Sequence, residues 1–298
     1  MLDWNTPKLS DKEWIEKCVK ESQYIGSDAA FANIYLLRSK YNIKVTYYKD
    51  LLIRYYEGLG NRKGYTFPLG RKDVLSALYA IEQDAKEMNR PLEFCFVTGE
   101  QKEILENTFA GRTESSSDAG DYDYIYGQPE LSLLSGRTYH KKKNHVSKFK
   151  RTYEDYMFCE IGNGNLDDVM LIEDEWYYDR LQQDDTSAMK EYEAIREAVD
   201  NFEELSLSGG IIYANNVPVA MTIASYINDA AVDIHFEKAV GEYAVNGGFA
   251  AINQMYASTL KDVKFINREE DINIPGLRKA KESYHPKFML KKYGVRVK

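Results

Sequence analysis

Hydrophobic and polar positions along the first 130 residues follow a pattern of short helices and strands. Apolar residues recur at helical spacing in three segments, at 13–20, 28–38 and 72–88. Strand-like runs occur at 43–48, 51–58, 64–70 and 92–98, and a further helix is predicted over about 100–108. The segment 111–123 is rich in Gly, Ser and Asp and predicts a long surface loop, after which YDYIYG (122–127) predicts a short strand that closes this half.

The second half of the chain repeats this order. Helices are predicted over about 184–204, 247–260 and 276–283. Strands are predicted over 210–215, 218–227, 230–239 and 263–268, with a last strand pair over roughly 286–298. Both halves therefore have three strands followed by alternating helix and strand, which indicates two α/β domains of the same kind.

A small-residue cluster, Asn246-Gly247-Gly248, stands where the third strand of the second half gives way to a helix. Asn246 is predicted to cap this helix, and the two glycines let a ligand approach the backbone N–H groups of its first turn. These groups and the helix dipole favour an anion such as a pyrophosphate or a nucleic-acid phosphate. On the residues alone, a plain turn is an equal alternative.

Four segments carry a resemblance to a known family: SDAAFANIYLLR (27–38), SGRTYHKKKNHVSKFKR (135–151), the Asn246-Gly247-Gly248 junction and NREEDINIPGLRKAKESYHP (267–286). The chain resembles the phosphatidylglycerol lysyltransferase C-terminal-domain family, which is related to the Fem-type aminoacyltransferases. The resemblance implies an α/β (α+β) fold of two tandem GNAT-like domains with mixed central sheets flanked by helices. The expected divisions are a degenerate first domain at 1–130, a basic connecting helix at 131–155 and a donor-binding second domain at 156–298.

The resemblance also implies a reaction. We expect transfer of an acyl or aminoacyl group from acyl-CoA or aminoacyl-tRNA to an amine or hydroxyl, with no permanently bound cofactor. Residues 210–298 are expected to form the donor half, and the family's transmembrane part is missing here, which speaks against a lipid acceptor. The expected donor-binding residues are Phe236, Val245, Asn246, Gly247, Gly248, Arg268, Arg278 and Lys279.

Acyl transfer requires a base, a stabilised oxyanion and an acid for the leaving group. His235 and Glu237 alternate with apolar neighbours in the third strand, which predicts that both point to one face and that either serves as the base. Tyr284 follows the penultimate helix, where many GNAT enzymes place a general acid. The alternatives are a solvated strand edge for the first two residues and packing against the last strands for Tyr284.

The segment 136–151 contains seven Lys and Arg residues and no acid, whereas the rest of the chain has 32 basic and 47 acidic residues. Helical spacing predicts a packed stripe of Tyr139, Lys142, Val146, Phe149 and Tyr153. The opposite face would contact tRNA phosphates, a CoA phosphate or an anionic membrane, or else compensate the acidic charge of the protein itself. The predicted basic patch consists of Lys141, Lys142, Lys143, Lys148, Lys150 and Arg151.

Net charge, cysteine spacing and the absence of common catalytic motifs exclude several classes of protein. The net charge of −8 argues against a uniformly basic protein, and three widely spaced cysteines suggest a reducing, cytoplasmic compartment. No signal peptide or membrane-spanning run is expected, although a peripheral position at the inner membrane face is an alternative. His140 and His145 have poor metal-ligand spacing, so no metal is predicted. No nucleophile elbow, P-loop or dinucleotide fingerprint is present, so the sequence does not support a serine hydrolase, a P-loop NTPase or a Rossmann dehydrogenase. Besides a transferase, two candidate functions stay open: a non-catalytic ligand-binding protein on the same scaffold and a peripheral membrane protein that uses the basic helix.

Overall fold

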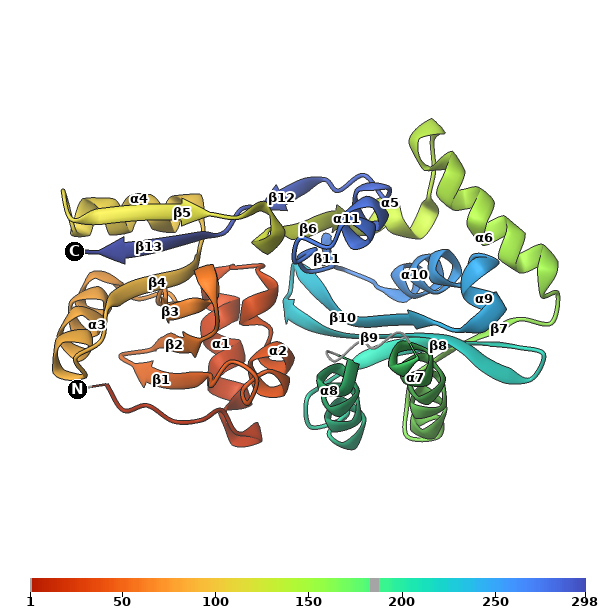
Figure 1. Ribbon diagram of the computed structural model, residues 1–298, viewed down its shortest axis with the longest axis horizontal. Coiled ribbons are helices and arrows are strands. Elements are labelled where there is room, and N and C mark those ends of the chain that lie inside the picture. Colours follow the sequence, from red (N-terminus) through yellow and green to blue (C-terminus); the bar gives the residue numbers. More distant parts are fainter. Residues whose placement is uncertain (1, 183–187) are drawn as a thin grey trace. The chain divides into compact units, whose positions relative to one another are not determined.

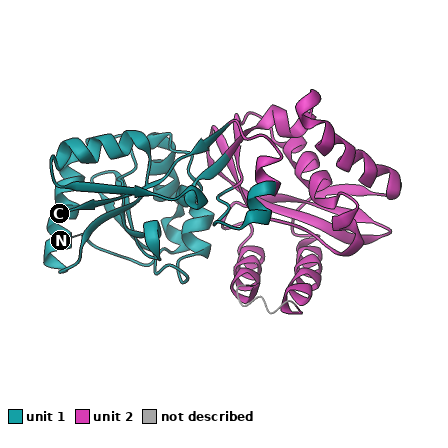
Figure 2. Cartoon of the chain, turned by 45° about the horizontal axis from the view of Figure 1, so that its top comes forward, with its two compact units in different colours: residues 1–124, 269–279, 288–298 teal, residues 125–268, 280–287 magenta. Residues whose placement is uncertain are grey.

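The computed structural model describes residues 2–182 and 188–298. The chain divides into two compact units, which Figure 2 distinguishes by colour. Unit 1 comprises Met1–Tyr124, Glu269–Lys279 and Phe288–Lys298, and unit 2 comprises Ile125–Arg268 and Ala280–Lys287. These units differ from the consecutive division expected at 1–130, 131–155 and 156–298. The C-terminal segments return to unit 1, and the basic segment is part of unit 2.

The sheet of unit 1 has six strands in the order β1-β2-β3-β4-β13-β5. They are β1 (Lys44–Tyr48), β2 (Leu51–Glu57), β3 (Lys63–Thr66), β4 (Leu92–Val97), β13 (Tyr293–Val297) and β5 (Thr113–Ser117). Only β3 and β4 run parallel to each other, and the other neighbours are antiparallel. The first three strand-like runs of the sequence thus form a meander, and the fourth, β4, pairs in parallel with β3.

Helices cover both faces of the central strand β2 in unit 1. The helices are α1 (Lys12–Ser22), α2 (Phe31–Leu36), α3 (Leu75–Glu87) and α4 (Gly99–Thr108), and short 3-10 turns lie at η1 (Leu9–Asp11), η2 (Ser27–Ala29), η3 (Gly60–Arg62) and η4 (Ala119–Asp121). Leu51, Ile53 and Tyr55 pack in one core with α3. Arg54 points to the opposite face and is also buried. This explains why β2 is almost continuously apolar.

A buried charge network occupies that opposite face of unit 1. Lys292 Nζ lies 2.6 Å from Asp123 Oδ1 and 3.1 Å from Asp28 Oδ1. Arg54 Nη2 lies 3.0 Å from Asp28 Oδ2. Burial alone would raise the pKa of Asp28, but Lys292 and Arg54 lower it. The network joins η2, β2 and the segment before β13, and it ties the end of the chain to unit 1.

The second sheet has seven strands in the order β12-β6-β11-β10-β9-β8-β7. The short β12 (Phe288–Leu290) lies at one edge, and six strands follow it. They are β6 (Asp123–Gly127), β11 (Phe265–Asn267), β10 (Ala231–Ala239), β9 (Val217–Asn228), β8 (Ser208–Ala214) and β7 (Met157–Glu160). Here β10 and β11 are the parallel pair, and the meander consists of β8, β9 and β10. Both units therefore have the same arrangement of a three-strand meander and a parallel fourth strand.

Helices flank the sheet of unit 2 on both sides, with α7 and α8 on one face and α10 on the other (Figure 1). The helices are α5 (Gln128–Leu133), α6 (His140–Thr152), α7 (Leu166–Leu181), α8 (Ala188–Asp200), α9 (Gly241–Val245) and α10 (Gly248–Thr259), with a 3-10 turn at η5 (Arg137–Tyr139). The helix α11 (Pro275–Glu282) and the short strand β12 (Phe288–Leu290) belong to the chain's last segments. The first residues of the predicted helix 184–204 lie outside the described part of the chain.

Several predictions about individual elements were wrong. The predicted loop 111–123 contains the strand β5, which pairs with β13. The sequence did not predict this strand because its side chains are polar and mostly exposed. The YDYIYG strand does not close the first sheet, because Ile125–Gly127 pair with β11 in unit 2. Conversely, β13 from the end of the chain completes the sheet of unit 1. The two halves of the sequence thus exchange β6 and β13 between their sheets. Four further elements, β7, α5, α7 and α9, were not predicted.

Candidate active site

The parallel strands β10 and β11 separate after a short contact. Their register pairs Ala231 with Phe265 and ends with Asp233 opposite Asn267. From there β10 continues to Ala239, whereas β11 has ended. The register of β10 with β9 also shifts between Ile234 and Phe236, which marks a β-bulge at His235. Such bulges are frequent next to active sites, where they redirect side chains.

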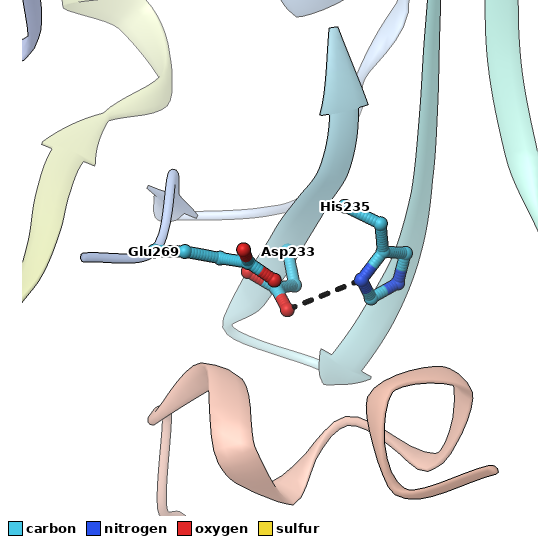
Figure 3. Close-up of side chains that lie close together, drawn as sticks. All are labelled: Asp233, His235 and Glu269. Carbon is cyan, nitrogen blue, oxygen red and sulfur yellow. Dashed lines mark ion pairs between the residues drawn. The ribbon is translucent and has the colours of Figure 1, made fainter. Parts of the chain in front are cut away.

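The bulge places His235 and Glu237 on opposite faces of the sheet, so the prediction that they share a face was wrong. His235 Nε2 lies 2.8 Å from Ser225 Oγ, and its Nδ1 lies 3.4 Å from Asp233 Oδ2 (Figure 3). Glu237 instead accepts a hydrogen bond of 3.0 Å from Asn253 Nδ2 on α10. One extra residue in a strand reverses the alternation of every side chain that follows it.

An ion pair between Glu237 and Arg268 spans the opening between β10 and β11. Arg268 follows β11 directly, and its Nη2 lies 2.7 Å from Glu237 Oε1. The two side chains are only 12% and 10% exposed. The Nη1 atom of Arg268 is buried and has no hydrogen-bond partner among the residues that the structure describes. A buried donor in this state is energetically unfavourable, and it can donate to an acceptor that enters the opening between β10 and β11.

Aromatic rings hold the guanidinium of Arg268 in this position. Its Cζ lies 4.7 Å from the centroid of the Tyr284 ring and 5.8 Å from that of Tyr126. The two rings pack edge to face, with centroids 6.4 Å apart. Lys281 Nζ donates a hydrogen bond of 2.5 Å to the backbone carbonyl of Arg268. Burial raises the pKa of Tyr284, so its phenol is protonated at neutral pH.

Lys142 of α6 completes the cluster. Its Nζ lies 3.7 Å from the centroid of the Tyr284 ring, and the side chain is half-buried. Burial and the positive charge of Arg268 lower the pKa of Lys142 to about 8. The sequence placed this lysine in a surface patch, and only its position in the predicted packed stripe signalled that it turns inward.

The start of α10 differs from the prediction in its capping residue. The N-cap is Gly247, with φ of 104°, and not Asn246. Asn246 donates a hydrogen bond of 2.8 Å from Nδ2 to Tyr153 Oη, which removes its side chain from the helix end. Gly247 and Gly248 are buried, and a Cβ at Gly247 would collide with the backbone carbonyl of His145 on α6. A glycine is therefore required where the two helices approach each other.

The other predicted donor-binding residues lie elsewhere. Phe236 is on the His235 face of the sheet, since its register partner Ile223 points the same way as Ser225. Val245 ends α9 and is 77% exposed. Arg278 belongs to unit 1, where its Nε lies 2.8 Å from Asp271 Oδ2, and Lys279 is exposed in the same unit. Their part in donor binding stays a prediction.

The helix α6 has one packed face and one charged face, as its spacing predicted. Tyr139, Val146, Phe149 and Tyr153 are buried. The side chains of Lys141, Lys143, Lys148 and Arg151 are exposed, and Lys150 is half-buried. In the part of the chain that the structure describes, these five side chains form no ion pair with an acidic residue. The basic patch is therefore not compensated by local acids, which leaves its charge available to a partner.

The family assignment follows from comparison with known proteins. The model of the family "Phosphatidylglycerol lysyltransferase, C-terminal" matches residues 20–296. The chain belongs to this family. The predicted resemblance is confirmed, as is the predicted fold class of two GNAT-like α/β units with mixed sheets and flanking helices. No curated protein matches the chain.

Two solved structures illustrate the relationship. A conserved protein of unknown function from Bacteroides thetaiotaomicron is 30% identical over 100% of both chains, with a TM-score of 0.94. L-PGS from Bacillus licheniformis is 15% identical over 96% of this chain and 92% of its own, with a TM-score of 0.67. Family and fold together indicate a GNAT-like or lysyltransferase-type transferase. Within residues 2–182 and 188–298, no helix is both long and apolar enough to cross a membrane.

Proposed function

We propose that unit 2 transfers an acyl or aminoacyl group at the opening between β10 and β11. The observation that carries this proposal is the Glu237–Arg268 pair, which spans the opening with Tyr284 packed against it. A base, a cationic hydrogen-bond donor and a protonated phenol thus converge on one point. These are the three functions that acyl transfer requires.

Each residue then has a defined role. Glu237 accepts the proton that the attacking amine or hydroxyl loses. Arg268 stabilises the oxyanion of the tetrahedral intermediate, for which its unpartnered Nη1 supplies a buried donor. Tyr284 returns a proton to the leaving group. His235 lies on the other face of the sheet, bound to Ser225, so it takes no direct part in this scheme.

The donor is a carrier with several negative charges, either acyl-CoA or aminoacyl-tRNA. The exposed basic patch of α6 favours phosphate groups. Lys142 connects the basic patch of α6 with the proposed reaction centre, because its side chain extends from the helix into the Glu237–Arg268 cluster. A carrier bound along α6 would therefore have its acyl end near Glu237. Anionic lipid headgroups are a second partner that the same patch fits.

Two substitutions test this assignment. Glu237→Ala and Tyr284→Phe should each reduce acyl transfer about 10²- to 10⁴-fold, the usual contribution of a general base or acid. Transfer is measured as release of free CoA, or of uncharged tRNA, in the presence of a panel of amines. Donor binding, measured by thermal shift, should change little in Tyr284→Phe, which keeps the ring.

The matched control is Glu175→Ala, because Glu175 is exposed on α7. Full transfer activity in both site variants would exclude the proposed chemistry. Donor binding without any transfer in the wild-type protein would favour the non-catalytic alternative on the same scaffold.

A further inference from the structure

Lys142 differs from its neighbours in the basic helix because its side chain reaches the Tyr284–Arg268 cluster, whereas Lys150, which is also half-buried, lies 5.6 Å from the Tyr156 ring centroid. Lys141 and Lys143, its neighbours in sequence, are exposed, whereas Lys142 is half-buried with its Nζ over the Tyr284 ring. The same ring carries the guanidinium of Arg268, so two cations share one aromatic side chain. This arrangement puts a primary amine beside the proposed reaction centre.

The charges around Lys142 do not balance. Arg268 is paired with Glu237 at 2.7 Å, and among the described residues no acid forms an ion pair with Lys142. Burial and the charge of Arg268 both disfavour the ammonium form, whereas the carboxylate of Glu237 favours it, and the resulting pKa of Lys142 is about 8. At pH 7.5 about a quarter of the Lys142 side chains would be neutral, against about 0.1% for an ordinary lysine. A neutral amine is a nucleophile, and an ammonium group is not.

We propose that Lys142 is an acyl-accepting side chain, a modification site that takes an acyl group at the opening between β10 and β11. This inference rests on the proposed function for its natural donor. The Nζ lone pair attacks the acyl carbon and forms an amide bond. The bond from that carbon to the sulfur or oxygen of the carrier breaks, and the carrier leaves as a thiol or hydroxyl with the proton that Lys142 loses.

Acylation of Lys142 should limit further binding of the donor at the same site. Acylated Lys142 carries no charge, so it no longer opposes Arg268 and no longer binds the Tyr284 face as a cation. The added acyl group also occupies space beside Glu237. A fully acylated chain should therefore bind its donor more weakly than the unmodified chain.

Labelling of the full-length protein tests the proposal with its own internal controls. The protein is treated at pH 7.5 with limiting acetic anhydride, which needs no enzyme activity, and separately with acetyl-CoA. Occupancy at each lysine is measured by peptide mass spectrometry. In the anhydride arm, Lys142 should react on the order of tenfold faster than Lys141 and Lys143. The neutral fraction favours it about 200-fold, and the lower nucleophilicity of a less basic group reduces that advantage.

Equal or slower labelling of Lys142 in the anhydride arm would overturn the proposal. Selective labelling in both arms supports the proposal and the proposed transfer together. Selective labelling by anhydride with none by acetyl-CoA supports the reactive lysine but counts against acetyl-CoA as the donor. Lys142→Arg should lose the signal while Lys141 and Lys143 keep theirs.

Discussion

Glu173 provides a quantitative test of the packing between α7 and the sheet of unit 2. Its side chain is fully buried, and neither carboxylate oxygen has a hydrogen-bond partner among the described residues. Burial raises the pKa of Glu173 to about 7. Lys238 lowers the pKa of Glu173 but does not offset the burial, and its Nζ lies 2.6 Å from Glu191 Oε1 and 2.9 Å from the centroid of the Trp176 ring.

The raised pKa makes the stability of unit 2 depend on pH in a defined direction. Below about pH 4.5 Glu173 is protonated in both the folded and the unfolded chain. As the pH rises, the unfolded chain loses this proton first, and the folded chain must then ionise a buried carboxyl group. The stability contributed by the protonated form is therefore lost through pH 7. Between pH 5 and 8.5 the loss amounts to about 2.5 kcal/mol.

The substitution Glu173→Gln isolates this effect, because it keeps the shape and removes the titration. The free energy of unfolding is measured in urea at pH 5 and at pH 8.5, with Trp176 as a fluorescence reporter in unit 2. The difference between the variant and the wild type should move by about 2.5 kcal/mol in favour of the variant as the pH rises. Glu175→Gln, on the exposed side of the same helix, should not change with pH in this way. A pH-independent difference for Glu173→Gln would refute the reasoning.

Two further substitutions test other parts of the fold, again by the free energy of unfolding in urea. Lys292→Met should destabilise unit 1 by about 3–5 kcal/mol, because the buried carboxylate of Asp123 loses its cationic partner, while Asp28 keeps its pair with Arg54. Lys291→Met at an exposed neighbouring position should change the free energy of unfolding by no more than about 0.5 kcal/mol. A loss below about 1 kcal/mol for Lys292→Met would mean that the network contributes little. Gly247→Ala should cost about 1–3 kcal/mol, because φ is 104° and the new Cβ meets the carbonyl of His145, while Gly276→Ala in open space should be neutral or stabilising. A Gly247→Ala protein as stable as the wild type would contradict the close approach of α6 and α10.

Local sequence patterns were sufficient to predict the repeated meander and the packed face of α6. Apolar runs bounded by turn residues predicted β8, β9 and β10 to within a few residues, because each strand is buried along most of its length. Helical spacing placed Val146 and Phe149 in the core for the same reason. These features depend on side chains close together in the sequence.

Features that depend on distant pairing were not predictable in this way. The exchange of β6 and β13 between the two sheets reflects which backbone edges meet, and no local spacing encodes it. The helix α7 was missed because its apolar residues are spread around the helix, without one continuous stripe.

The same limit applied to the candidate site. The bulge at His235 reversed the side-chain alternation that had put His235 and Glu237 together. A run of three lysines suggests a solvated surface. Helical spacing placed the middle one, Lys142, in the packed stripe of α6, but its contact with Tyr284 depends on tertiary structure. Glu237, Arg268 and Tyr284 were predicted individually, but their convergence depends on the separation of β10 from β11.

Donor binding is the most direct test of the central claim that unit 2 grips an acyl carrier beside the Glu237–Arg268 pair. The measurement is a thermal-shift titration of the full-length protein with acyl-CoAs and with aminoacyl-tRNAs. One donor class should stabilise the folded protein by about 2.7 kcal/mol at a concentration of 100 Kd, and this shift should shrink in Arg268→Ala. If neither donor class stabilises the wild-type protein, the proposed transfer function is contradicted.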